Sequence, residues 1–133
     1  MIKSIAAIAA GLVTWFVVAT LANFVVRSAL PGYTDVEVAM NFTQGMLFAR
    51  LVVGALASVT AGFVTGWIAG ARRGAVVILT VLLLAVFLPV HYALWDRFPA
   101  WYHAMFLLSL VIAPSIGAWI RSGLPDAGRA GQS

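Results

Sequence analysis

"AVVILTVLLLAVFLPVHYALW", residues 75 to 95, is the stretch that decides the fold, because it contains no aspartate, glutamate, lysine or arginine. A helix of about 20 apolar residues is long enough to cross a hydrocarbon core of about 30 Å. Residues 5–26, 51–71 and 100–120 meet the same requirement. Because backbone N–H and C=O groups find no water inside a bilayer, each of the four stretches is predicted to be an α-helix.

The composition supports a membrane location for the whole chain. Of its 133 residues 63% are hydrophobic and 9% charged, and the mean hydropathy is +1.04, whereas soluble domains carry roughly a quarter charged residues. The connections after the second and third stretches are short, which favours antiparallel neighbours. We therefore expect an all-α integral membrane protein in which residues 1–121 form one compact antiparallel bundle of four transmembrane helices. The first apolar run is longer than the usual 7–15 residues of a signal peptide, so we expect it to be retained.

Several functional classes lack the residues that they need. Cysteine is absent, which removes thiol catalysis, disulfides and cysteine-ligated metals. The basic residues are dispersed along the chain, so no nucleic-acid-binding patch is predicted. The sequence contains no P-loop, dinucleotide fingerprint or set of nucleophile, base and orienting residue. We therefore predict a protein that is not an enzyme and has no cofactor.

The positions of the basic residues predict the orientation, because cytoplasmic connections carry an excess of lysine and arginine. One side of the predicted bundle holds Lys3, Arg72, Arg73, Arg121 and Arg129, and the other holds Arg27, Arg50 and Arg97 beside Asp35, Glu37 and Asp96. Both termini are therefore predicted to be cytoplasmic. Residues 122–133 are polar and are predicted to form a disordered cytoplasmic tail. The strong preference for arginine over lysine and the many alanines indicate a GC-rich bacterial genome, hence a bacterial inner membrane.

The longest connection is predicted to contain a short amphipathic helix, at about residues 34–49. "TDVE" at 34 to 37 fits a capping box, in which Thr34 and Glu37 each satisfy a free backbone N–H. Glu37, Asn41 and Gln44 share one face of this helix, and apolar residues share another. The helix is expected either to lie along the outer membrane surface or to continue the second transmembrane helix out of the membrane.

Small residues recur at every fourth position of the second stretch and, over a shorter length, of the fourth. In a bilayer such stripes allow two helix backbones to approach closely. The stripes indicate close helix contact either inside the bundle, with a second copy, or with another membrane protein through the second helix. Their members are Gly54, Ser58, Gly62, Gly66 and Gly70 in the second stretch, and Ser109, Ala113 and Gly117 in the fourth.

The hairpin between the third and fourth stretches gathers aromatic residues and both histidines. Tyr92, Trp95, Trp101 and Tyr102 are predicted to form an aromatic belt at the outer membrane surface. His91 and His103 lie equally far from Arg97 in sequence, so both are expected at a similar depth.

The histidines admit four interpretations. The simplest places both imidazoles near the wet edge, bonded to headgroups, water or a backbone carbonyl. The others are a metal site with Asp96 and Glu37, a haem site across a subunit interface, and a proton-sensitive gate or relay. The wider candidate polar site comprises His91, His103, Asp96, Arg50, Glu37 and Asn23, with Glu37 or Asp96 as the expected partner of Arg50.

Together these patterns favour a non-enzymatic accessory or scaffold subunit that acts through close helix packing, with the lipid bilayer and a second membrane protein as partners. The first alternative is a small homo-oligomeric channel or transporter with the polar residues lining an outer vestibule. The second is a membrane redox subunit that binds metal or haem.

Overall fold

A computed structural model describes residues 1–70 and 72–126, and within these ranges every regular element is helical. The elements are α1 (Ile2–Ala29), α2 (Tyr33–Glu37), α3 (Gln44–Ala69), α4 (Arg73–Ala93), the 3-10 turn η1 (Trp95–Arg97) and α5 (Ala100–Ser122). Four of them, α1, α3, α4 and α5, are long and apolar enough to cross a membrane. The predicted all-helical fold with four apolar spans is thereby confirmed.

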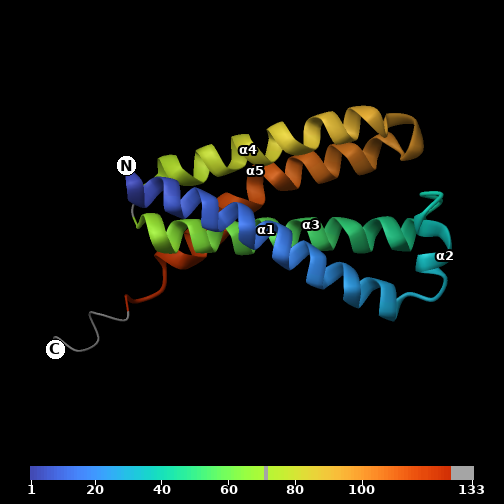
Figure 1. The fold of residues 1–133 in the computed structure, drawn as a ribbon, viewed down its shortest axis with the longest axis horizontal. Helices are drawn as coiled ribbons and strands as arrows, with labels where there is room; N and C mark the ends of the chain where they lie inside the picture. Colours follow the sequence, from blue (N-terminus) through green and yellow to red (C-terminus); the bar gives the residue numbers. More distant parts are fainter. Residues whose placement is uncertain (71, 127–133) are drawn as a thin grey trace.

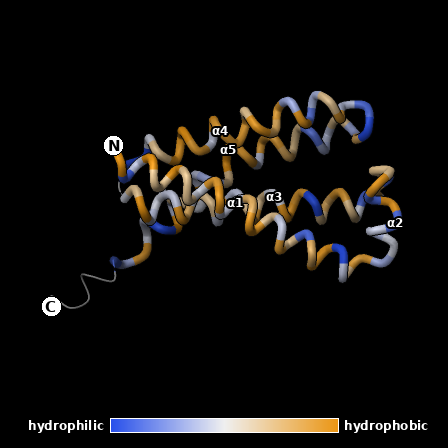
Figure 2. The backbone as a smooth tube through the Cα atoms, in the orientation of Figure 1, coloured by the Kyte–Doolittle hydropathy of each residue, from blue (hydrophilic) through white to orange (hydrophobic). Residues whose placement is uncertain are grey.

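The four long helices lie roughly along one axis (Figure 1). The N-terminus, the end of α3, the start of α4 and the last turn of α5 lie at one end, called here the N-terminal end. The segments α2 and η1 lie at the opposite end, called here the α2 end. Hydrophobic residues cover most of the length of the helices, and hydrophilic residues gather toward the two ends (Figure 2). This distribution matches a bilayer with water on both sides.

Helix α3 is the centre of the packing, because its most extensive contacts are with α5 and α1. Its contact with α1 is close because α1 buries Ala7, Gly11 and Ala19 on one face. A methyl group at Gly11 would overlap the hydroxyl of Thr65 on α3. The same Thr65 hydroxyl donates a hydrogen bond to the Ala7 carbonyl, over 3.2 Å. Small side chains therefore bring the two helices near enough for a direct side-chain to backbone bond.

The segment between α1 and α3 differs from the prediction. A single amphipathic helix over residues 34–49 is wrong, because α2 ends at Glu37 and α3 begins at Gln44. The predicted capping box is wrong too: α2 starts after Gly32, in the left-handed conformation with φ of 78°, and has no side-chain cap. The Glu37 carboxylate is instead occupied by Arg27. The alternative, in which residues 34–49 continue the second transmembrane helix, is correct only from Gln44 onward, where α3 begins.

The start of α3 is set by Thr43, whose hydroxyl accepts a hydrogen bond from the Met46 N–H over 3.3 Å. Such N-caps satisfy one of the free N–H groups of a first helical turn.

At the other end of the chain, Arg121 bonds the carboxylate of Asp126 over 2.7 Å and the carbonyl of Leu124 over 3.2 Å. The remainder of the predicted tail, from residue 127, lies outside the described residues.

Candidate functional site: a buried polar cluster at the α2 end

The two histidines meet inside the bundle. The Nδ1 atoms of His91, on α4, and His103, on α5, are 2.7 Å apart. His103 has no exposed surface and His91 is 7% exposed. The ring of Trp95 stacks on His103 at 4.7 Å between centroids, and Phe106 covers His91 at the same centroid distance. The expected bonds to headgroups or water are therefore wrong, because each imidazole is the other's partner. A bond to a backbone carbonyl, which the same interpretation allowed, is found for His103, at Trp95.

The hydrogen bonds assign the tautomers. The Nε2 of His103 lies 3.2 Å from the carbonyl oxygen of Trp95, which can only accept, so His103 Nε2–H is the donor. A neutral His103 then has a free lone pair on Nδ1, and His91 donates its Nδ1–H to it. This bond survives with the pair neutral or singly protonated. Two added protons would set two N–H donors against each other and break it.

Arg50 forms the second half of the cluster. Its guanidinium donates hydrogen bonds to the hydroxyl of Tyr33 at 3.0 Å and to that of Tyr102 at 3.3 Å. The guanidinium carbon also lies 4.7 Å from the centroid of the Phe42 ring, a cation–π distance. The predicted partners Glu37 and Asp96 are wrong, since neither forms an ion pair with Arg50 within the described ranges. Arg50 instead joins α3 to the α2 segment and to α5.

The remaining members of the predicted polar site lie apart from the cluster. Glu37 binds Arg27 through a two-atom contact whose shortest distance is 2.7 Å. The hydrogen bond from Arg27 lowers the pKa of the Glu37 carboxyl below its ordinary value. Asp96 lies exposed in η1. Among residues 1–70 and 72–126, no three histidine or acidic side chains are grouped closely enough to hold a metal ion. The histidines therefore do not form a metal site with Asp96 and Glu37.

Asn23 is partly exposed on α1, and its carboxamide forms no hydrogen bond with any other described residue. It follows Ala7, Gly11, Trp15 and Ala19 at the same four-residue spacing. Asn23 therefore continues the face of α1 that packs against α3. Toward α2 the two helices diverge (Figure 1), and Asn23 lies on this part of α1 with intermediate exposure.

The predicted aromatic belt is divided by the fold. Tyr92 is 86% exposed and Trp95 is 53% exposed, and Trp101 is half-buried. Tyr102 is only 2% exposed and contributes its hydroxyl to Arg50. Its assignment to the belt is therefore wrong, because the start of α5 turns this ring toward α3.

The small-residue stripe of α3 lies mainly against α5. A methyl group on Gly62 would overlap the backbone carbonyl of Pro114, and one on Gly66 would lie 3.3 Å from Ala118. Gly117 of α5 in turn faces the backbone of Val59, and Gly54 faces the ring of Phe106. The remaining members of the two stripes have other contacts. Ser58 accepts a hydrogen bond from the Trp15 indole N–H, and the Ser109 hydroxyl donates one to the Phe106 carbonyl of its own helix. Ala113 is buried, and Gly70 ends α3 with φ of 67°.

Sequence reasoning missed the residues that close the cluster. Tyr33 and Phe42 come from the connection that was expected to be amphipathic surface, yet Tyr33 has no exposed area. It missed the packing face of α1 as well. The signal was present, since the small residues Ala7, Gly11 and Ala19 are separated by multiples of four positions.

Comparisons with models of known protein families, with curated proteins and with solved structures found no match for this chain.

Proposed function

We propose that this protein is a non-enzymatic accessory subunit of a bacterial inner membrane, which binds another membrane protein through helix contacts. The observation that carries the proposal is the closed state of the polar cluster. Each charged or polar head group in it is bonded to another group of the same chain. No buried side-chain nitrogen or oxygen in the described ranges lacks a hydrogen-bond partner. These bonds join α2, α3, α4 and α5 to one another, so the cluster is suited to holding the four elements together.

The contact with a partner is proposed to involve Asn23 on α1. A carboxamide in a transmembrane helix forms hydrogen bonds across helix contacts, which contribute about 0.6 kcal/mol on average. Asn23 has an unbonded carboxamide, and apolar side chains around it are exposed, among them Leu21 at 61% and Phe24 at 59%. The glycine stripe of α3 is occupied by α5, which leaves this part of α1 as the better surface for a partner helix.

We further propose that the bundle is antiparallel and that its N-terminal end faces the cytoplasm. The support is charge: Lys3, Arg72, Arg73 and Arg121 lie at this end, and cytoplasmic connections are enriched in basic residues. The chain has no native cysteine, so single cysteines report on sidedness directly. A membrane-impermeant maleimide added outside intact cells should label Asp35→Cys and leave Gly74→Cys unlabelled. Labelling of Gly74→Cys instead would reverse the orientation.

Site-specific cross-linking in native membranes tests the partner contact. A photoreactive amino acid replaces Phe24 in one variant and, as a control, Val81 of α4 in another, because the two side chains are similarly exposed at 59% and 57%. We expect the Phe24 variant to capture a protein different from this chain, and the Val81 variant to capture none. Asn23→Leu should weaken the capture about threefold. Thr20→Val should leave it unchanged, because the Thr20 hydroxyl is already bonded to Phe16 within α1.

The outcomes separate the proposed functions. Capture of a different protein that depends on Asn23 supports the accessory subunit. Capture of a second copy of the chain supports the homo-oligomeric channel or transporter instead. Capture of lipid alone from both positions contradicts both, because α1 would then face only the bilayer.

A further inference from the structure

We propose that a cleft at the N-terminal end binds one anionic phospholipid, with its phosphate on Arg73 and an acyl chain between α4 and α5. This inference is independent of the proposed function. The cleft has a volume of about 600 Å³. Its floor is α3 at Gly66 and Gly70, and its walls are the first turns of α4 and the last turns of α5.

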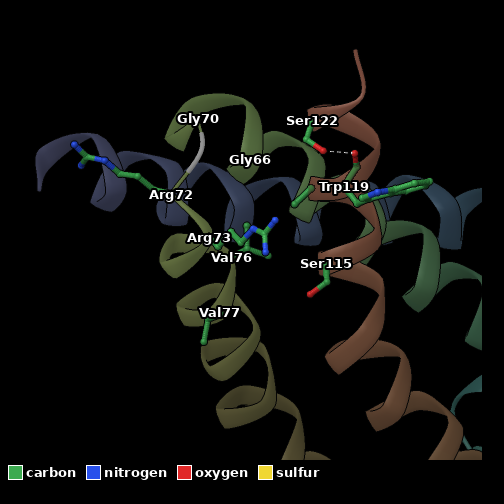
Figure 3. A pocket seen from close by; sticks show the side chains of 10 residues that line it. Gly66, Gly70, Arg72, Arg73, Val76, Val77, Ser115, Trp119 and Ser122 are labelled. Carbon is green, nitrogen blue, oxygen red and sulfur yellow. Dashed lines mark hydrogen bonds between the residues drawn. The ribbon is translucent and has the colours of Figure 1, made fainter. Parts of the chain in front are cut away.

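The mouth of the cleft is positively charged and has no balancing acid. Arg73 reaches from α4 into the space beside α5 (Figure 3), and it forms no hydrogen bond or ion pair with any described residue. Arg72 points away from this space toward α1 (Figure 3), where it contacts the Ser4 hydroxyl over 3.5 Å. The one acidic residue described at this end, Asp126, is held by Arg121. Arg73, without a carboxylate partner, therefore remains for an external anion, and its planar guanidinium group suits a phosphate.

The depth of the cleft selects a lipid over a free phosphate. Its lining extends from Ser122 down α5 to Ser115, which is about 10 Å at the rise of an α-helix. Val76 and Val77 of α4 form the facing wall, and the Ser115 side chain projects toward them (Figure 3). A polar mouth that leads into an apolar slot matches a phosphate joined to a hydrocarbon chain. Inorganic phosphate would use the mouth alone.

The position relative to the membrane fits the same ligand. Trp67 and Trp119 flank the cleft and are 63% and 75% exposed. Tryptophan is enriched at the level of lipid headgroups, so Arg73 lies at the depth where phospholipid phosphates lie. Below the cleft, exposed Ile78 and Ile112 continue the apolar surfaces of α4 and α5 toward the middle of the membrane. An acyl chain can follow these surfaces without leaving the hydrocarbon.

The test measures lipid retention by native mass spectrometry of the full chain, released from nanodiscs that contain equal phosphatidylglycerol and phosphatidylcholine with the same acyl chains. We expect the wild type to keep one phosphatidylglycerol in preference to phosphatidylcholine. Arg73→Gln should lower that retention about fivefold, since one basic residue near a membrane surface contributes a factor of about that size. Lys3→Gln is the matched control, because it removes one charge from the same end outside the cleft.

A second variant tests the slot without changing charge. Val77→Trp fills the cleft from an exposed position and should abolish preferential retention while circular dichroism and elution volume stay unchanged. Equal losses in Lys3→Gln and Arg73→Gln would overturn the proposal in favour of nonspecific surface charge. Full retention in Val77→Trp would overturn the acyl-chain slot. Displacement of the lipid by millimolar inorganic phosphate would show that the site binds a free anion.

Discussion

A methyl group added at Gly62 tests the packing of α3 against α5 most sharply. The Cβ of an alanine there would overlap the carbonyl of Pro114, which belongs to the α5 backbone and cannot rotate away. By contrast, nothing lies within 4 Å of a Cβ at Gly74. Both glycines are helical, so both replacements gain up to about 1 kcal/mol of helix propensity. The comparison between the two variants therefore isolates the steric overlap.

Overpacking of this kind costs about 1–3 kcal/mol. We expect Gly62→Ala to be less stable than Gly74→Ala by that amount, with Gly66→Ala between them because its Cβ would lie 3.3 Å from Ala118. The assay is reversible unfolding of the purified protein in mixed micelles at increasing SDS fraction, followed by far-ultraviolet circular dichroism. Identical midpoints for Gly62→Ala and Gly74→Ala would refute the close approach of the two helices.

Three further predictions concern the α2 end. His91→Phe removes the Nδ1–H donor to His103 and should lower the free energy of unfolding by about 1–3 kcal/mol in the same assay; an unchanged midpoint would contradict the contact between the two histidines. Arg50→Lys loses the planar group that bonds two hydroxyls and should lower stability in the same assay, whereas Arg97→Lys, in exposed η1, should not. Arg27→Gln should raise the pKa of Glu37 in an NMR titration, because the lowered pKa comes from the Arg27 hydrogen bond. The stabilisation by this pair is present above the ordinary carboxyl pKa and is lost as the pH falls through the lowered pKa. An unchanged Glu37 titration in the variant would contradict the assignment.

The four spans were predictable because the length and hydropathy of a transmembrane helix are local properties of the sequence. The stretch at residues 75–95 needed no knowledge of its neighbours, and α4 covers most of it. The connection before α3 was not predictable in the same way. Thr34 and Glu37 fit a local capping pattern, but Glu37 binds Arg27 from the preceding helix. A contact between two elements overrode a local preference.

The candidate site shows the same contrast between features set by local sequence and features set by contacts between helices. Hairpin geometry placed His91 and His103 at one depth, and the structure brings them within hydrogen-bond distance. Whether they faced water or the core depended on the rotation of α5, which is set by glycine contacts with α3 rather than by the hairpin sequence. For Arg50, the expectation of an acidic partner ignored tyrosine, whose hydroxyl also accepts a hydrogen bond from a guanidinium. Tyr33 and Tyr102 were therefore missed as its partners.

The measurement that tests the central claim most directly is native mass spectrometry of the wild-type protein released gently from its own membrane. An accessory subunit should appear in a complex of defined mass that contains a different membrane protein, and Asn23→Leu should deplete that complex while Thr20→Val leaves it intact. A homo-oligomer of uniform stoichiometry, or a free monomer in both the wild type and Asn23→Leu, would contradict the claim.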